Sequence, residues 1–227
     1  PTSGRGIVAL WAATTLFLLT GLKLAAALVR AHSKPPEDNL DVTTLAKQPR
    51  VSVLVALFRE PEIADRLIKR LSRIDYPPAL LEVCLVVEAG DFVTRDALRR
   101  AKLPCNFRVI AAPGGPIKTK PRALNYALRL CRGSIIGVYD AEDAPEPAQI
   151  RKVVRRFQSR GPDVACLQGV LDFYNTRTNW LSRCFAIEYA TWFRVILPGL
   201  SRMGLVVPLG GTTLNIRREA LGGLEGR

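Results

Sequence analysis

The stretch from Ile135 to Pro147, IIGVYDAEDAPEP, most constrains what this chain can fold into. Four β-prone residues and a glycine lead directly into Asp140, Glu142 and Asp143, and two prolines then interrupt the backbone. A short buried strand bounded by turn signals fits this pattern. Such a strand carries its acids at its carboxyl end, where open α/β sheets bind ligands. Crowded carboxylates repel one another unless a cation or donors hold them, so the stretch predicts a divalent metal site; an acidic loop that merely caps the next helix is the alternative.

Apolar runs and helical periodicities alternate on both sides of this stretch. The strands that we expect are Val51–Leu57, Leu81–Val87, Phe107–Ile110, Ile135–Tyr139 and Val164–Gln168. The helices that we expect between them cover Glu62–Leu71, Asp96–Lys102, Lys118–Leu128 and Pro147–Gln158. Strands that alternate with helices of this length are typical of βαβ units. The chain is therefore predicted to be an α/β protein with a mostly parallel sheet flanked by helices.

An apolar segment precedes the first strand and predicts a transmembrane helix. The segment from Gly6 to Val29 contains a single charge, Lys23, and would extend roughly 36 Å as a helix, against about 30 Å for a bilayer core. Lys23 lies two turns from the end and can reach the interface. A signal peptide is the alternative, although no small-residue cleavage pattern is visible. We expect an anchor at residues 1–31 and a linker at 32–50, where prolines and polar residues accumulate.

The charges that flank the apolar segment predict its orientation. Arg5 stands alone before it, whereas basic residues follow it at positions 23, 30, 34, 47 and 50. By the positive-inside rule, the chain after residue 31 lies in the cytoplasm and the helix spans the inner membrane.

Composition narrows the class of partner. The net charge is +13, which suits anionic partners such as nucleic acids, membrane surfaces or phosphorylated substrates. Only 7% of residues are aromatic, and no basic and aromatic residues interleave as they do in base-stacking proteins, so nucleic acid is not expected. The five cysteines form no Cys-x-x-Cys pair and there is one histidine, which disfavours a structural zinc site or a disulfide framework.

The segment from Asn179 to Ile196 is rich in large apolar residues and leaves two alternatives open. Arg194 interrupts it, and Pro198 and Arg202 follow closely, so it is not expected to cross a membrane. A helix that lies at the membrane interface and an ordinary core helix fit it equally well.

Functional groups follow three of the expected strands. Glu60 comes after the first, Glu88 and Asp91 after the second, and Asp140 after the fourth, while Lys120 lies at a helix start. Lysines and a helix N-terminus favour phosphate, and acids favour a metal or sugar hydroxyls. A nucleoside diphosphate with a bridging divalent cation would satisfy both. No Gly-x-Gly-x-x-Gly or P-loop sequence is present, so neither a dinucleotide dehydrogenase nor a P-loop nucleotidase is indicated.

Five blocks in this order resemble family 2 glycosyltransferases, and most closely their membrane-bound, cellulose-synthase-like branch. The blocks are residues 51–60, 88–91, 118–128, 139–147 and 210–218, of which YDAEDAPEP is the most specific. The resemblance covers about residues 50 to 227 and implies a GT-A-like nucleotide-sugar-binding domain over 51–227.

The resemblance also implies roles for individual residues. It places the donor, a UDP-sugar, against Ala56, Phe58, Glu60, Glu88, Asp91, Lys120, Asn125 and Asp140. It places Mg²⁺ or Mn²⁺ on Asp140 and Glu142, where Glu142 replaces the usual second aspartate of the D-x-D motif. It places the acceptor, a glycan or a lipid, near Gly211, Thr212, Arg217 and Arg218.

One departure from the family pattern is a missing motif. Inverting members use a later aspartate, in a Thr-Glu-Asp stretch, as the base that deprotonates the acceptor, and processive members add Gln-x-x-Arg-Trp. Neither string occurs in these 227 residues. We therefore expect a domain that is incomplete at its C-terminal end, binds donor and transfers poorly. The alternatives are a catalytically dead membrane-tethered scaffold and a polyprenyl-phosphate sugar transferase.

Overall fold

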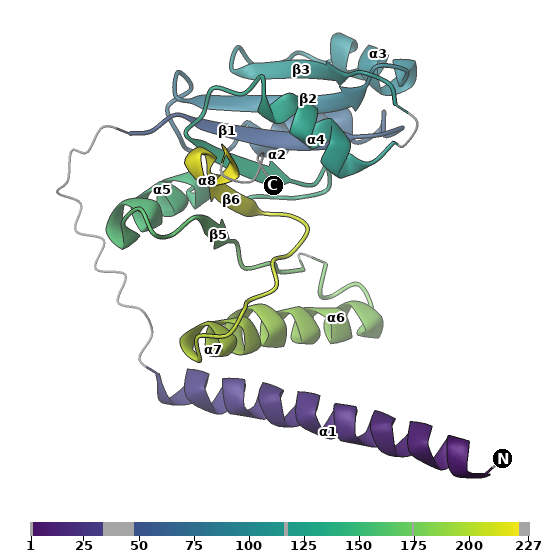
Figure 1. Cartoon of the computed structure of the whole chain (residues 1–227). Coiled ribbons are helices and arrows are strands. Elements are labelled where there is room, and N and C mark those ends of the chain that lie inside the picture. Colours follow the sequence, from purple (N-terminus) through teal and green to yellow (C-terminus); the bar gives the residue numbers. More distant parts are fainter. Residues whose placement is uncertain (1, 34–47, 116–117, 174, 223–227) are drawn as a thin grey trace. The chain divides into compact units, whose positions relative to one another are not determined.

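The computed structural model describes residues 2–33, 48–115, 118–173 and 175–222. Its contacts divide the chain into two compact units. Unit 1 combines residues 1–39 with 170–209, and unit 2 combines 40–169 with 210–227 (Figure 1). The predicted boundaries treated everything from residue 51 onward as one domain. By contacts, residues 170–209 instead form an insertion in that domain, and this insertion groups with the N-terminal helix.

Unit 2 contains a six-stranded mixed sheet in the order β3-β2-β1-β4-β6-β5. Four strands are parallel: β1 Val51–Leu57, β2 Leu81–Glu88, β3 Phe107–Ala112 and β4 Ile135–Tyr139. β6 Leu214–Arg217 pairs antiparallel with both β4 and β5 Cys166–Gln168. The predicted α/β class and mostly parallel sheet are confirmed. The strand β6 was not expected, because its four residues contain two polar side chains and a strand of that length gives little periodicity.

Helices cover both faces of this sheet because its strands are apolar on both sides. One core cluster joins alternate residues of β1 and β2, such as Val53 and Leu85, to α2 Ala64–Leu71, α3 Phe92–Arg100 and α5 Gln149–Arg160. The other joins Leu54 and Val86 to α4 Lys120–Leu128 and α8 Arg218–Gly222. Strands buried on both faces read as continuous apolar runs, which is how β1, β2 and β4 appear in the sequence.

All four of the expected helices start away from their predicted positions, and the structure shows what fixes two of the starts. α3 begins at Phe92, four residues earlier than expected, because the Asp91 side chain accepts a hydrogen bond from the backbone N–H of Thr94 and caps the helix. α4 begins at Lys120, two residues later than expected, and Thr119 occupies its N-cap position without making a side-chain capping hydrogen bond. A proline in the first turn stabilises this start instead.

Unit 1 is helical in its described part. It contains α1 Thr2–His32, α6 Trp180–Thr191, a π-helical turn η1 Trp192–Ile196 and α7 Leu197–Arg202. Among the described residues, Gly4–His32 is the one helix long and apolar enough to cross a membrane, which is weak support for an anchor. The predicted linker at 32–50 lies largely outside the described residues.

Candidate functional site

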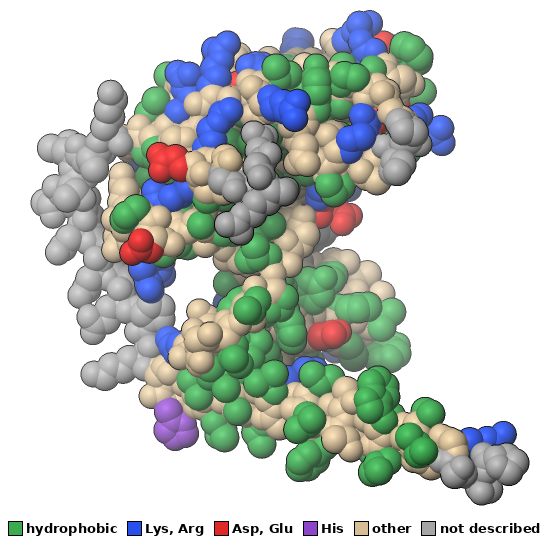
Figure 2. All heavy atoms as spheres, viewed as in Figure 1, with side chains coloured by type: hydrophobic (Ala, Val, Ile, Leu, Met, Phe, Trp, Pro, Cys, Tyr) green, Lys and Arg blue, Asp and Glu red, His purple; other side chains and the backbone are tan. Residues whose placement is uncertain are grey.

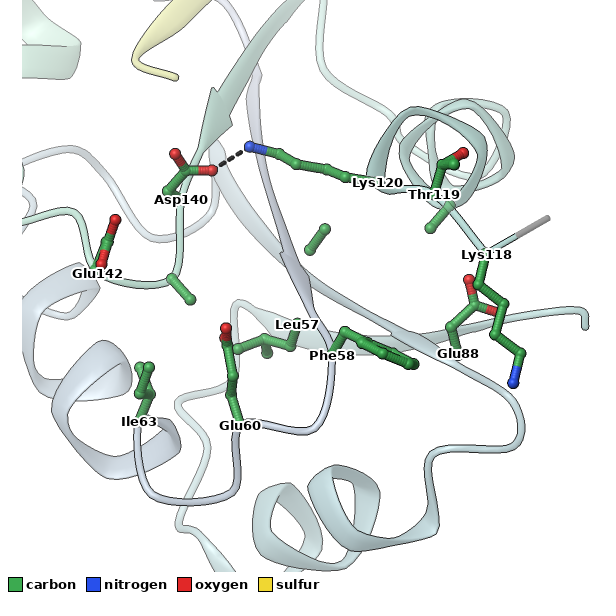
Figure 3. A pocket seen from close by; sticks show the side chains of 13 residues that line it. Leu57, Phe58, Glu60, Ile63, Glu88, Lys118, Thr119, Lys120, Asp140 and Glu142 are labelled. Atoms are coloured by element: carbon green, nitrogen blue, oxygen red, sulfur yellow. Dashed lines mark hydrogen bonds and ion pairs between the residues drawn. The ribbon is translucent and has the colours of Figure 1, made fainter. Parts of the chain in front are cut away.

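A pocket of about 360 Å³ opens at the carboxyl ends of the parallel strands (Figure 3). Parallel strands all end at the same edge, so the loops that follow β1, β2 and β4 converge there with the start of α4. The lining residues are Ala56, Leu57, Phe58, Glu60, Ile63, Glu88, Lys118, Thr119, Lys120, Ala123, Asp140, Ala141 and Glu142. Most of the predicted donor-binding residues therefore lie together.

Three carboxylates, those of Glu60, Asp140 and Glu142, line one side of the pocket (Figure 3). Burial raises the pKa of Glu60, and the charges of Glu142 and Asp140 raise it further. Carboxylates that lie this close together favour a shared cation, because a cation removes the repulsion between them. Oxygen-only donors of this kind suit the hard cations Mg²⁺ and Mn²⁺.

Lys120 supplies the opposite charge at the start of α4. Its ammonium group forms an ion pair with Asp140 and donates a hydrogen bond to the Gly211 carbonyl oxygen at 3.4 Å. Both members of the ion pair have side chains that are 36% exposed, so each can exchange its partner for a ligand. Lys118 also lines the pocket. The two lysines give the pocket a cationic side that suits a phosphate chain.

The third acid of the motif, Asp143, braces the loop instead of lining the pocket. Its carboxylate accepts hydrogen bonds from the Asp140 N–H at 2.8 Å and from the hydroxyl of Thr212. That hydroxyl oxygen also accepts the Asp140 N–H at 2.9 Å. Thr212, predicted as an acceptor-side residue, therefore fixes the backbone of the metal-site candidate, and Gly211 is in reach of Lys120.

The two acids of the β2 end both accept hydrogen bonds from protein donors. The Glu88 side chain is 6% exposed, and both of its oxygens accept hydrogen bonds from Arg122, whose guanidinium also donates to the Pro113 carbonyl. Asp91 accepts a hydrogen bond from the Arg59 N–H at 2.6 Å as well as capping α3. Burial alone would raise the pKa of Asp91, but these hydrogen bonds outweigh burial and lower it.

The Asp91 contact holds a strained turn beside a second hollow. Arg59 adopts a positive φ of 56°, which a non-glycine residue holds only when its surroundings impose it. The hollow measures about 490 Å³ and shares Phe58 and Lys118 with the first pocket. Asp91 therefore reaches the site through this hollow and through the loop that it shapes.

Three of the predicted site residues neither line the pocket nor contact the loops that form it. Asn125 is exposed on α4 and does not line it. Arg217 pairs with Ile135 at the amino end of β4, roughly 16 Å along the sheet from Asp140. Its guanidinium stacks over the Phe157 ring and donates to three carbonyl oxygens around the end of α5. Arg218 donates to carbonyl oxygens at the end of α4. Both arginines are structural in these positions, because the strand β6 carries them away from the acceptor-side segment.

Arg122, which holds the pocket residue Glu88, is not among the residues predicted from the sequence. It lies two residues after Lys120 in the same helical turn. The sequence did contain a reason to expect such a residue, because Glu88 is an acid at the end of a buried strand and a buried acid needs a cationic partner.

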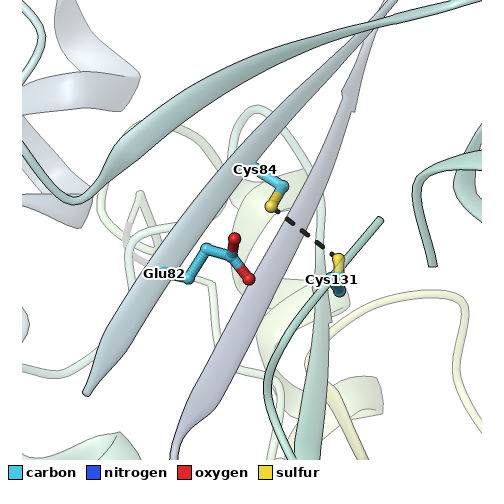
Figure 4. Close-up of side chains that lie close together, drawn as sticks. All are labelled: Glu82, Cys84 and Cys131. Atoms are coloured by element: carbon cyan, nitrogen blue, oxygen red, sulfur yellow. Dashed lines mark hydrogen bonds between the residues drawn. The ribbon is translucent and has the colours of Figure 1, made fainter. Parts of the chain in front are cut away.

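A second group of potential ligands lies near the amino ends of the strands, where Glu82, Cys84 and Cys131 approach one another (Figure 4). The two sulfur atoms are 3.8 Å apart. The Glu82 carboxylate already accepts hydrogen bonds from Ser52 at 2.7 Å and Arg108 at 2.8 Å. Contact with the Cys131 thiol, followed by burial, raises the pKa of Cys84 and keeps it protonated. A metal would need the thiolate and the free carboxylate, so this cluster is better explained as core packing beside an ion pair.

The fold and the pocket together define a GT-A-like domain of the kind that binds nucleotide sugars. The chain belongs to the glycosyltransferase like family 2, whose model matches residues 49–226.

Relatives and solved structures agree with this family. The chain is 28% identical over 223 residues to the beta-monoglucosyldiacylglycerol synthase of Synechocystis sp., covering 95% of this chain and 44% of that protein. It is 26% identical over 182 residues to the probable glycosyltransferase YdaM of Bacillus subtilis, covering 78% and 43%. The chain thus spans less than half the length of these relatives. Its fold resembles that of the mannosyltransferase PcManGT from Pyrobaculum calidifontis, solved with GDP-Man and Mn²⁺, with a TM-score of 0.65 at 24% identity over 92% of this chain and 57% of that one.

Proposed function

We propose that this chain is the donor-binding part of a membrane-anchored, inverting glycosyltransferase that uses a UDP-sugar and a divalent cation. The observation that carries the proposal is the pocket in which Glu60, Asp140 and Glu142 face Lys118 and Lys120. Such a pocket combines oxygen ligands for a cation with ammonium groups for phosphate, and a nucleoside diphosphate bound with a cation requires both.

Asp140 and Glu142 are the residues that would hold the cation. Glu142 is exposed and Asp140 is partly exposed, so a cation from solvent can reach both. When bound, the cation would neutralise charge that develops on the leaving diphosphate. Lys120 would exchange Asp140 for a phosphate oxygen when donor enters, because its long side chain lies at the rim of the same pocket.

The β1 and β2 ends would hold the nucleoside. Phe58 is 45% exposed and offers a ring face for stacking, and it directly precedes the strained Arg59 turn that Asp91 holds. Glu88 offers acceptor oxygens at the back of the pocket, oriented by Arg122. Oriented acceptors select a base that presents an N–H group, as uracil does.

The acceptor that we favour is a membrane lipid, so that the product is a glycolipid. This preference rests on the relative named as a glucosyldiacylglycerol synthase and on the long apolar helix α1. We propose that α1 spans the inner membrane with the catalytic unit in the cytoplasm. A polysaccharide acceptor, as in the cellulose-synthase-like branch, and a polyprenyl-phosphate acceptor remain alternatives that use the same donor pocket.

Calorimetric titration of UDP in the presence and absence of Mn²⁺ tests this function. The Asp140→Asn variant should weaken UDP binding in Mn²⁺ at least about tenfold, or 1.4 kcal/mol, because it removes a charged ligand. Asp163→Asn is the matched control, since Asp163 is exposed and lies outside the pocket lining. Equal affinities in Asp140→Asn and the unsubstituted protein, or UDP binding that ignores Mn²⁺, would contradict the proposal.

A further inference from the structure

The helical insertion of unit 1 leaves an unusual amount of apolar surface exposed. We call the segment from Trp180 to Leu209, which contains α6, η1 and α7, the apolar layer. α6 buries none of its residues. Trp180 is 74% exposed, Ile187 67% and Val206 92%. Of the two alternatives for this segment, the ordinary core helix is therefore wrong for α6. Exposed apolar surface of this extent marks a binding surface.

The apolar layer is attached to α1 at one end of that helix. Ala26 of α1 is fully buried against Ile196, Leu197 and Leu200 of the layer. A side chain at Gly199 would overlap with the backbone at Ala26, so the two helices touch backbone to backbone there. This contact places the apolar layer beside the C-terminal part of α1, at the level of Ala26.

That level corresponds to the edge of a bilayer rather than its middle. The 29 residues from Gly4 to His32 extend about 43 Å, while a bilayer core requires about 20 residues. The earlier part of α1 exposes its large apolar side chains, with Phe17 at 79% exposed. The part that contacts the layer is flanked by Lys23 and Arg30, and Arg30 donates a hydrogen bond to the Arg194 carbonyl at 3.2 Å. Charged residues at the end of an apolar helix belong at the interface.

The composition of the layer matches the same environment. Two of the three tryptophans of the chain, Trp180 and Trp192, lie in it. Arginines at 183, 194 and 202 are interspersed among its apolar residues, against a single acid, Glu188. Asp172, which precedes the layer, pairs with Arg194. Tryptophan prefers the headgroup level, and arginine among apolar residues favours anionic lipid. Figure 2 shows the hydrophobic side chains, in green, along the helices of unit 1.

We infer that the apolar layer is a membrane-binding surface that lies in the headgroup region of an anionic bilayer, at the end of α1. The inference rests on the proposed anchoring by α1. It adds that residues 180–209, which do not span the bilayer, make their own contact with lipid. A second copy of the chain, or another protein segment, would cover the same residues without lipid contact, so the two occupants can be separated by experiment.

Fluorescence of single labels in the reconstituted chain of residues 1–227 provides the test. In a background where the three cysteines that are not buried, Cys105, Cys166 and Cys184, are serine, an environment-sensitive dye is attached to Ile187→Cys. Phe17→Cys reports on the anchor, and retained Cys105, exposed in unit 2, serves as the control. The vesicles contain phosphatidylcholine and phosphatidylglycerol, with nitroxide-labelled lipids whose quencher lies either at the headgroup or deep in the acyl chain.

The label at 187 should emit at shorter wavelength than the label at 105, and headgroup nitroxides should quench it several-fold more strongly. The label at 17 should be quenched best by deep nitroxides. The label at 17 could be quenched while the label at 187 emits as in water, or is shielded from water without being quenched by lipid. Either result would refute membrane binding by the apolar layer and would leave the α1 anchor supported. Absence of quenching at both positions would refute the anchor as well. Neither result affects UDP titration, which tests the donor pocket separately.

Discussion

The buried ion pair between Arg122 and Glu88 predicts how single and double substitutions change the free energy of unfolding of unit 2. The Glu88 side chain is 6% exposed and the Arg122 side chain 30%. Arg122→Ala leaves a buried carboxylate without its two charge-assisted hydrogen bonds. Removing one partner of a buried pair costs about 3–5 kcal/mol, and the partial exposure of Arg122 brings our estimate to about 3 kcal/mol for the free energy of unfolding of unit 2. Adding Glu88→Gln removes the stranded charge and should restore about 1–2 kcal/mol.

The assay must report on unit 2 alone. All three tryptophans lie in unit 1, so their fluorescence does not follow the sheet. Cys84 is fully buried in the sheet, and its reaction with a maleimide at increasing urea, read by mass spectrometry, measures opening of unit 2. The urea midpoint should fall in Arg122→Ala and rise again in the double variant. A double variant that is less stable than Arg122→Ala would show that the two side chains do not form the buried pair and would refute the reasoning.

Three further predictions use the same preparations. Lys120→Met should bind Mn²⁺ alone about threefold more tightly, because the lysine no longer competes for Asp140, yet bind UDP with Mn²⁺ about tenfold more weakly by calorimetry. Burial, followed by the neighbouring carboxylates, raises the pKa of Glu60. Protonated Glu60 therefore stabilises the fold at pH values below its ordinary pKa of 4.5, and this stabilisation is lost as the pH rises through the raised pKa. Glu60→Gln should accordingly raise the melting temperature at neutral pH and leave it unchanged in acid. A Cβ at Gly133 would overlap with the backbone of β1, so Gly133→Ala should lower the free energy of unfolding of unit 2, measured by Cys84 labelling in urea, by about 3 kcal/mol. Gly114→Ala, which has open space around it, should leave this free energy unchanged.

Much of unit 2 could be predicted because its strands are apolar on both faces and end in turn residues. Val51–Leu57 and Ile135–Tyr139 were predicted with the bounds that the structure gives. The strand β6 could not be predicted from the sequence, because tertiary contacts with β4 and β5 determine it rather than its own four residues. Missing β6 also misplaced Arg217, since a strand that runs antiparallel to β4 carries its later residues away from the carboxyl edge.

The candidate site was predicted to the extent that strand ends determine it. Glu60 and Asp140 follow parallel strands and Glu88 ends one, and topology alone brings them together. What the sequence could not show is which acids face the pocket. Asp143 and Asp140 lie three residues apart, but one braces a loop and the other faces the pocket, a difference made by the hydroxyl of Thr212 from 69 residues further along the chain.

The base of the insertion explains how a helical segment can interrupt a sheet so close to the pocket. The Gln168 side chain accepts a hydrogen bond from the Gly210 N–H at 2.8 Å and donates to the carbonyl oxygens of Gly169 and Thr212 at 3.0 Å. It therefore joins the residue before the insertion to the residue after it. Because unit 2 closes this loop itself, the packing of residues 170–209 is not needed to pair β5 with β6. Residues 170–209 can therefore carry exposed apolar side chains for binding without disturbing the sheet. The same Thr212 that Gln168 holds also accepts the Asp140 N–H, so the closure of the insertion and the geometry of the metal-site candidate belong to one hydrogen-bonded group.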